Sequence, residues 1–363
     1  MMERTAIVVV GGYGAVGRTV CTELAARFPG RVFAAGRNIE KASSFSQETK
    51  GRVLPLRLDI TDPSTTANIL DGAGVVVACT ESGDATRDAG LARAYLDHGI
   101  HYVDVSASYA LLNEVEKLDA LARRRAATAV LSVGLAPGLT NLLARQCVDV
   151  LGDELRNIDV SILIGLGEAH GEGAVRWTVE NLDKRFDAPG LGTVGSLEAP
   201  KKTLFPAPYG ARTCYRFDFA DQHVLARTLG AERVATRLCL DSAAATRLLA
   251  LAKRVGAFRA LGGPRGQDVL VALFSRLRIG SDGFAVKAEA EGRGGSVYSC
   301  SARGRGEART TGVVAAFVVE RLLTSPSLER GVFHIEQLFE PVDLFGRMED
   351  LGLTVDLQNG RPE

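Results

Sequence analysis

The stretch that decides the fold is Ala6-Ile7-Val8-Val9-Val10-Gly11-Gly12-Tyr13-Gly14-Ala15-Val16-Gly17. Its first five residues are an apolar run of the length and composition of a buried strand. From Val16 onward, apolar residues repeat at the four-residue spacing of a helix, at Val20 and Leu24. The stretch therefore predicts a strand, a tight glycine-rich turn and a helix in direct succession.

The three spaced glycines of this turn have separate expected tasks. Gly12 allows the chain to turn tightly, Gly14 lets the backbone approach a pyrophosphate, and Gly17 allows close packing of the helix on the strand. A helix N-terminus also offers free N–H groups and a partial positive charge to phosphates. We therefore predict that a dinucleotide binds here, on the residues Gly12, Tyr13, Gly14, Ala15, Val16 and Gly17.

Five more short apolar runs follow within the first 150 residues, separated by amphipathic segments. This alternation is typical of βαβ units around a parallel sheet. It predicts an α/β fold with a doubly wound, Rossmann-type parallel sheet. The further expected strands are Val32–Ala35, Val53–Leu58, Val75–Ala78, Tyr102–Val105 and Ala129–Val133.

The pattern changes after about residue 152. Ile158, Val160, Ile162 and Ile164 alternate with polar or small residues, and a similar alternation runs from Phe284 to Ala290. These strands predict a second α/β domain with a mixed or antiparallel sheet. An apolar helical stripe from Val313 to Leu322 predicts a return to the first domain. The expected domains are 1–140, which binds the cofactor, 141–305, for substrate and dimerisation, and C-terminal helices in 306–363.

Composition narrows the possible partners. The chain contains 43 cationic residues (Lys and Arg) and 43 anionic residues (Asp and Glu). It therefore has no net charge that would attract nucleic acid or a membrane surface. The six cysteines have neither CxxC nor CxxH spacing, which indicates reduced thiols and no metal cluster. No apolar run approaches the roughly 18 to 20 residues of a membrane span. We expect a cytoplasmic protein with a small-molecule substrate, no nucleic-acid or membrane partner and no metal.

The residue after the second strand indicates which dinucleotide binds. NAD sites usually place an acid about 20 residues after the glycines, whereas this chain has Arg37 there. A guanidinium suits the 2′-phosphate of NADP(H), and Asn38 and Lys41 could add to it. The alternative is that Arg37 is a solvated loop cation. Asp59, after the third strand, could accept from the adenine amino group or cap the next helix.

Polar and small residues also follow the fourth, fifth and sixth strands. In open parallel sheets the ligand lies beyond the carboxyl ends of the strands. We therefore expect these residues near the nicotinamide ribose, although they could equally be ordinary caps and turns. They are Thr80 and Glu81, Ser106, and Pro137 with Gly138.

The densest polar cluster of the second domain lies between Gly165 and Gly173. It contains Glu168 and His170, followed by Arg176 and Trp177. His170 could exchange a proton with an amine or imine nitrogen, and Arg176 could hold a substrate carboxylate. We predict Glu168, His170 and Arg176 as catalytic residues. The alternative is that this loop is structural or solvated, and that Trp177 lies in the core.

Several of these segments together resemble the saccharopine dehydrogenase family, in particular its shorter bacterial NADP-binding members. The likeness extends over most of the chain and is strongest to about residue 180. The segments that carry it are Val9–Gly17, Ala35–Asn38, His101–Asp104, Gly134–Leu139, Gly167–Gly171, Trp177–Thr178 and Asp218–His223.

The resemblance implies a Rossmann domain, an inserted domain that closes the substrate cleft and often dimerises, and C-terminal helices that return. It also implies that NADPH delivers hydride to an imine formed from an amine or amino acid and a carbonyl compound, or the reverse oxidation. Ala136 stands where the family commonly has Asp, and Thr140-Asn141 replaces Asp-His, so the substrate stays open. The alternatives are an NADPH-dependent reductase of a C=O or C=C bond, and a non-catalytic NADP(H) sensor or scaffold.

Overall fold

The computed structural model describes residues 5–67, 69–167, 171–276, 279–325, 327–349 and 352–360. The chain forms two units, one of residues 1–138 with 308–338 and the other of residues 139–307 with 339–363. This division differs from the predicted one mainly in the tail. Residues 339–363 group with the second unit because the last strand pairs with that unit's sheet.

The first unit contains a seven-stranded, entirely parallel sheet of order β15-β6-β5-β4-β1-β2-β3. All six predicted strands are present, and the predicted Rossmann-type sheet is confirmed. Most of their side chains are buried, as expected of strands covered on both faces. The strands are β1 (Ala6–Val10), β2 (Val32–Gly36), β3 (Leu54–Arg57), β4 (Ala73–Ala78), β5 (His101–Asp104), β6 (Thr128–Leu131) and β15 (Gly331–His334).

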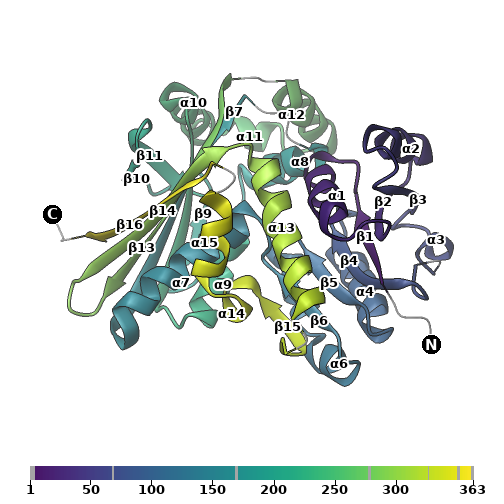
Figure 1. The fold of residues 1–363 in the computed structure, drawn as a ribbon. Helices are drawn as coiled ribbons and strands as arrows, with labels where there is room; N and C mark the ends of the chain where they lie inside the picture. The colour runs from purple at the N-terminus through teal and green to yellow at the C-terminus, as the bar shows by residue number, and fades with distance from the viewer. Residues whose placement is uncertain are drawn as a thin grey trace. The chain divides into compact units, whose positions relative to one another are not determined.

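Helices of the first unit begin where the sequence supplies caps. The Asp84 carboxylate accepts from the Thr86 and Arg87 N–H groups at the start of α4, and Ser108 caps α5. The predicted returning stripe lies on α13, where Gly312 packs against Thr19 of α1. The helices are α1 (Ala15–Arg27), α2 (Ile39–Glu48), α3 (Pro63–Ala67), α4 (Ala85–Asp97), α5 (Tyr109–Glu116), α6 (Asp119–Arg124), α13 (Glu307–Thr324) and α14 (Ile335–Leu338) (Figure 1).

The seventh strand, β15, was not predicted. It pairs in parallel with β6, although some 200 residues separate the two along the chain. His334 at its end is buried between Ser132 (Nδ1 to Oγ, 2.8 Å) and Glu116 (Nε2 to Oε1, 2.9 Å). The tail thus completes the edge of the first sheet with a strand as well as with helices.

The second unit contains a mixed sheet of order β10-β11-β12-β7-β13-β14-β16. β12 and β7 are parallel and the other pairs are antiparallel, so the prediction of a mixed or antiparallel sheet is confirmed. The strands are β7 (Leu155–Leu166), β10 (Lys201–Phe205), β11 (Gly210–Arg216), β12 (Arg233–Leu240), β13 (Ile279–Gly292), β14 (Val297–Arg305) and β16 (Thr354–Gly360), with a separate hairpin β8 (Arg185–Ala188) and β9 (Gly192–Gly195).

Helix α7 packs against this sheet, with the Cys147 thiol 3.6 Å from the Ala288 carbonyl oxygen of β13. It ends at Gly152, whose φ of +59° suits glycine. Another left-handed glycine, Gly256 (φ +77°), separates α10 from α11. The helices are α7 (Thr140–Leu151), α8 (Glu172–Asn181), α9 (Ala220–Thr228), α10 (Ala243–Arg254), α11 (Ala257–Ala260), α12 (Pro264–Arg276) and α15 (Pro341–Glu349).

Candidate functional site

The glycine turn joins β1 to α1 at the carboxyl end of the sheet. Its left-handed residue is Gly11 (φ +78°), which shifts the tight turn one position from the predicted Gly12. Gly12 is required for another reason, because a Cβ there would lie 2.6 Å from the Ala34 Cα of β2. A Cβ on Gly17 would overlap the Gly11 carbonyl oxygen, so Gly17 is required for the close approach of α1 to the turn itself.

Gly14 is the exposed N-cap of α1. A Cβ on Gly14 would meet only the Gly11 carbonyl oxygen, at 3.1 Å, so the space outside it is open. Ala15, Val16 and Gly17 follow, and the first turn contains no acid that would neutralise the helix terminus. Free N–H groups, positive helix potential and open space coincide here, which is the arrangement that binds a pyrophosphate.

Tyr13 organises the loop after β2. Its hydroxyl accepts a hydrogen bond from the Asn38 N–H (3.0 Å) and lies against Gly36, where a Cβ would come within 2.5 Å of it. Asn38 in turn caps α2, because its Oδ1 accepts from the Lys41 N–H (2.9 Å). The structure therefore shows Asn38 as a helix cap, and its predicted cofactor contact stays a prediction.

Arg37 is exposed directly after β2, and a second cation lies next to it. Arg57, the last residue of β3, is the register partner of Gly36 and is also exposed. Hydrogen bonds from Thr61 hold the pKa of Asp59 below its usual value, and the nearby Arg37 and Arg57 lower it further. In the sequence, Arg57 only interrupts an apolar run, so its place beside Arg37 was not predicted.

Asp59 stabilises a turn. Its Oδ1 accepts from the Thr61 N–H (2.9 Å) and from the Thr61 hydroxyl (2.8 Å). The next helix is capped by Asp62, whose Oδ1 accepts from the Ser64 N–H. Asp62 and not Asp59 therefore caps the next helix, and the contact of Asp59 with the adenine amino group stays a prediction.

The ends of β4 and β5 lie close to the glycine turn. Thr80 is exposed, and its Cβ would be 3.3 Å from a Cβ on Gly11. Glu81 beside it is exposed. Ser106 is buried, and its Oγ accepts from the Ser108 N–H (2.9 Å) at the start of α5. Thr80 thus borders the predicted cofactor turn, whereas Ser106 is engaged in building its own loop.

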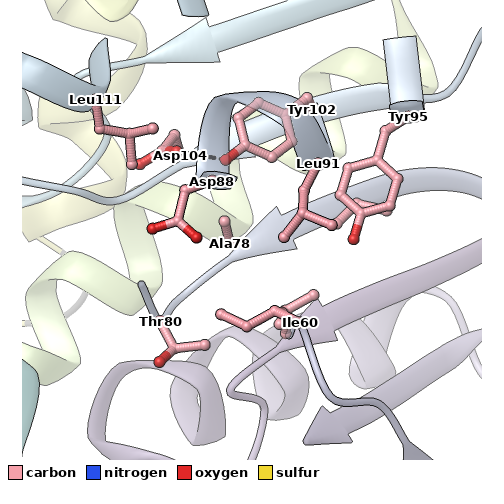
Figure 2. A pocket seen from close by; sticks show the side chains of 11 residues that line it. Ile60, Ala78, Thr80, Asp88, Leu91, Tyr95, Tyr102, Asp104 and Leu111 are labelled. Carbon is pink, nitrogen blue, oxygen red and sulfur yellow. Dashed lines mark hydrogen bonds between the residues drawn. The ribbon is translucent and has the colours of Figure 1, made fainter. Parts of the chain in front are cut away.

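A small cavity of about 20 Å³, room for roughly one water molecule, lies below these strand ends. Figure 2 shows the Tyr102 hydroxyl directed at Asp104, to which it donates (2.5 Å). The other Asp104 oxygen accepts from the Ser106 N–H (2.7 Å). Burial raises the pKa of Asp104 to about 6, against the effect of these hydrogen bonds. Asp104 therefore fixes the loop that leads to Ser106 and titrates near neutral pH.

Asp88 of α4 lines the same cavity. Its Oδ2 accepts from the Ser82 N–H (2.9 Å), which ties down the loop after β4. Its Oδ1 and the Tyr95 hydroxyl are buried without a hydrogen-bond partner among the described residues. Burial raises the pKa of Asp88 as well. Two buried acids thus support two neighbouring loops at the cofactor edge.

Pro137 and Gly138 lie at the end of the first unit and are buried. Gly138 has a φ of +137°, and a Cβ there would be 3.2 Å from the Ser132 carbonyl oxygen. The loop before them is held by α13, since the Leu135 N–H donates to the Thr311 hydroxyl (3.1 Å). These contacts explain the glycine structurally, and a cofactor contact stays a prediction.

The predicted catalytic cluster is only partly visible. Glu168 and His170 lie outside the described residues. Arg176, on α8, forms an ion pair with Asp268 of α12 (3.1 Å). Trp177 packs against Phe217 and Phe219, with ring centroids 5.7 and 5.1 Å away. Trp177 therefore belongs to an aromatic cluster of the second unit.

An ionic network around the buried carboxylate of Asp218 adjoins this aromatic cluster in the sequence. Asp218 lies between Phe217 and Phe219 and accepts from His223 (Nε2, 2.7 Å) and Lys184 (Nζ, 2.7 Å). Burial raises the pKa of Asp218, but these two partners hold it below its usual value. In the sequence, the segment Asp218–His223 was noted only for its resemblance to the family. The spacing of its residues does not indicate that Lys184 pairs with Asp218.

Comparison with known protein families identifies the first unit. Residues 7–130 match the family model described as saccharopine dehydrogenase NADP binding domain. This domain belongs to the saccharopine dehydrogenase family. For this domain the predicted family and the predicted NADP(H) cofactor are confirmed, and the domain indicates an NADP(H)-dependent oxidoreductase.

Solved structures extend the comparison to the whole chain. Saccharopine dehydrogenase (L-Glu forming) from Saccharomyces cerevisiae matches with a TM-score of 0.68 and 17% identity, covering 98% of this chain and 100% of that chain. A probable dehydrogenase from Thermotoga maritima matches with a TM-score of 0.46 and 8% identity, covering 97% and 98%. The first likeness shows a shared fold. The comparison with curated proteins finds no match.

Two further features concern the described part of the chain. None of its helices combines the length and the apolar character required to cross a bilayer. It also brings together no group of three His, Cys, Asp or Glu side chains that could hold a metal ion.

Proposed function

We propose that the protein transfers hydride from NADPH to an imine formed from an amine or amino acid and a carbonyl compound, or catalyses the reverse oxidation. Hydride adds to the imine carbon and a proton to the nitrogen, which gives an amine and NADP⁺. One observation carries the proposal. The chain joins the family's NADP binding domain to a second unit, and together they follow the fold of a saccharopine dehydrogenase over almost their full lengths.

On the cofactor side, we assign the pyrophosphate to the N-terminus of α1 outside Gly14. The 2′-phosphate is assigned to Arg37 together with Arg57, because both are exposed and both act on the same carboxylate, Asp59. Two guanidinium groups supply charge-assisted hydrogen bonds, which suits a dianionic phosphate. Tyr13 positions this loop through the Asn38 N–H.

On the substrate side, His170 and Glu168 are proposed for proton transfer and Arg176 for a substrate carboxylate. Arg176 already pairs with Asp268, so a carboxylate substrate has to compete with Asp268 for the guanidinium. An amino-acid-derived substrate follows from this assignment. Loss of turnover in His170→Ala, with NADPH binding retained, is the expected result for the proton-transfer role, and full turnover contradicts it.

The test of the reaction class is a screen of NADPH oxidation with four arms: amine alone, carbonyl compound alone, both together, and an activated alkene. Oxidation only with both supports imine reduction. Oxidation with the carbonyl compound alone, or with an activated alkene, identifies a C=O or C=C reductase. NADPH binding without oxidation in any arm favours the sensor or scaffold. The predicted homodimer is checked separately by light scattering of the eluting protein.

A further inference from the structure

Exposed apolar side chains gather on one segment of the second unit. Ten large apolar side chains are exposed in the described part of the chain, and six of them lie within residues 248–273. Single exposed leucines are ordinary on a protein surface, whereas a dense group marks an interaction face. The six are Leu248, Leu251, Val255, Leu261, Val269 and Leu273.

Helix α10 and the residue after it carry the centre of this group. Ala244, Leu248, Leu251 and Val255 are spaced by four, three and four residues, so they lie on one helical face. Leu248, Leu251 and Val255 are 66%, 55% and 71% exposed. We call these four residues the apolar stripe.

The other side of α10 packs on its own unit. Thr246 is buried, and its hydroxyl accepts from the Leu240 N–H of β12 (2.9 Å). Lys253, on the same side, pairs with Asp183. The apolar stripe therefore lies on the side of α10 opposite Thr246 and Lys253. Helix α10 itself is at the upper left of Figure 1.

The charges around the apolar stripe have a single sign. Residues 242–267 contain five cations and no Asp or Glu. Arg247, Arg254 and Arg265 are exposed and form no ion pair with any residue that the structure describes. Arg247 and Arg254 are seven residues apart, so they line the same edge of the apolar stripe. The balance of 43 cations and 43 anions over the whole chain conceals this local excess.

The apolar stripe and the arginines beside it together indicate what kind of partner can bind this face. Two copies of α10 paired antiparallel would bring their arginine edges together, and no acid of this segment would offset the repulsion. A surface that is both anionic and apolar fits better, because arginines reach phosphates while leucines insert below them.

We propose that α10, with Leu261 after α11, binds the surface of a bilayer that contains anionic phospholipid. The leucines and valine of the apolar stripe enter the acyl boundary, and Arg247 and Arg254 contact lipid phosphates. The interaction is peripheral and holds the oxidoreductase at the membrane surface. It differs from the expectation, drawn from the balanced net charge and the lack of a long apolar run, that the protein has no membrane partner.

The test is flotation of the full chain with two kinds of vesicle. One kind is phosphatidylcholine alone, and in the other about one lipid in three is phosphatidylglycerol, which makes the surface anionic. Wild type should float only with the anionic vesicles. Arg247→Glu with Arg254→Glu should weaken binding on the order of tenfold or more, since each cation contributes about fivefold. Leu248→Ser with Leu251→Ser should weaken it to a similar extent.

Two matched variants serve as controls. Leu204→Ser removes an equally exposed leucine from β10, and Arg124→Glu reverses an exposed arginine on α6. Both should float like wild type, and retained NADPH binding shows that every variant is folded. The proposal is overturned if wild type fails to float with anionic vesicles, or if it is a dimer that Leu248→Ser with Leu251→Ser dissociates.

Discussion

The two sheets carry their polar side chains in different places. In the first unit the strands are apolar along their length, and polar groups gather at their carboxyl ends, as at Arg37, Thr80 and Asp104. In the second unit charges lie within the strands, where Asp159 of β7 pairs with Arg237 of β12 and Lys201 of β10. We therefore assign the ligand site to the polar groups at the strand ends of the first sheet, whereas the charges within the second sheet link its strands to one another.

The largest expected effect concerns the cofactor edge of the first sheet. Gly14→Val should weaken NADPH binding by about a hundredfold to ten-thousandfold, because a side chain there displaces the pyrophosphate from two or more N–H groups. Calorimetry measures the affinity. The melting temperature should change little, since a Cβ on Gly14 meets only one atom within 4 Å.

Gly90→Val is the matched control for Gly14→Val. A Cβ on Gly90, in α4 of the same unit, meets nothing within 4 Å. This variant should bind NADPH like wild type. Unchanged NADPH affinity in Gly14→Val would instead place the pyrophosphate elsewhere and remove the distinction between the two sheets.

The second prediction tests the charges within the other sheet. Asp159→Asn should lower the free energy of unfolding by about 3 kcal/mol, because it leaves buried Arg237 and nearby Lys201 without their shared carboxylate. NADPH affinity should stay the same. Denaturant titration and calorimetry measure the two quantities.

An exposed ion pair provides the comparison for Asp159→Asn. Asp97 pairs with Arg125 on the surface of the first unit, and Asp97→Asn should cost less than about 1 kcal/mol. If Asp159→Asn leaves stability unchanged but abolishes turnover, Asp159 belongs to a ligand site and the structural interpretation of this sheet fails.

The third prediction follows from the pKa of Asp104. Burial raises this pKa to about 6. Between about pH 4 and 6 the folded protein therefore keeps a proton that the unfolded chain has already released. Wild type should therefore lose stability relative to Asp104→Asn as the pH rises from 4 to 7, by up to about 3 kcal/mol. Denaturant titrations across this range give the slope.

Asp221 offers a matched case in the second unit. It is fully buried, burial raises its pKa to about 6, and it accepts from the Thr236 hydroxyl (2.6 Å). Asp221→Asn should also remove a loss of stability with rising pH. Only Asp104→Asn should in addition alter NADPH binding, because Asp104 holds the loop to Ser106. Equal effects of both on NADPH binding would argue against a cofactor-edge role for Asp104.

The smallest expected effect is on cofactor choice. Arg37→Ala should weaken NADPH binding by about ten- to hundredfold through loss of a charge-assisted hydrogen bond, and should leave NADH binding nearly unchanged. Arg124→Ala, an exposed arginine on α6, should affect neither. Equal weakening of NADPH and NADH by Arg37→Ala would contradict the 2′-phosphate assignment.

Local requirements made the first sheet predictable from the sequence. Each of its first six strands is a short apolar run, and the spaced glycines directly follow the first of these runs. The turn's left-handed residue, Gly11, was still missed, because Gly11 and Gly12 can be told apart only by their distances to β4 and β2. The short strand β15 was missed because a four-residue run gains its identity from pairing with distant β6.

The candidate site was less predictable because much of it depends on tertiary contacts. Arg57 lies beside Arg37 only because β3 pairs with β2, and Lys184 reaches Asp218 from outside its motif. Asn38 and Ser106 also have structural uses that the sequence did not predict, since each accepts a hydrogen bond from a backbone N–H of its own loop. The residue types showed which positions are polar. They did not show which of these side chains form the hydrogen bonds that stabilise their own loops.

The most direct test of the central claim follows the hydride. NADPH deuterated at the transferred position of C4 is incubated with the protein and an amine and carbonyl pair that supports oxidation, and the product is analysed by mass spectrometry. The account predicts one deuterium on the carbon of a new C–N bond. Deuterium on the carbon of an alcohol, or on a reduced C=C bond, would contradict it.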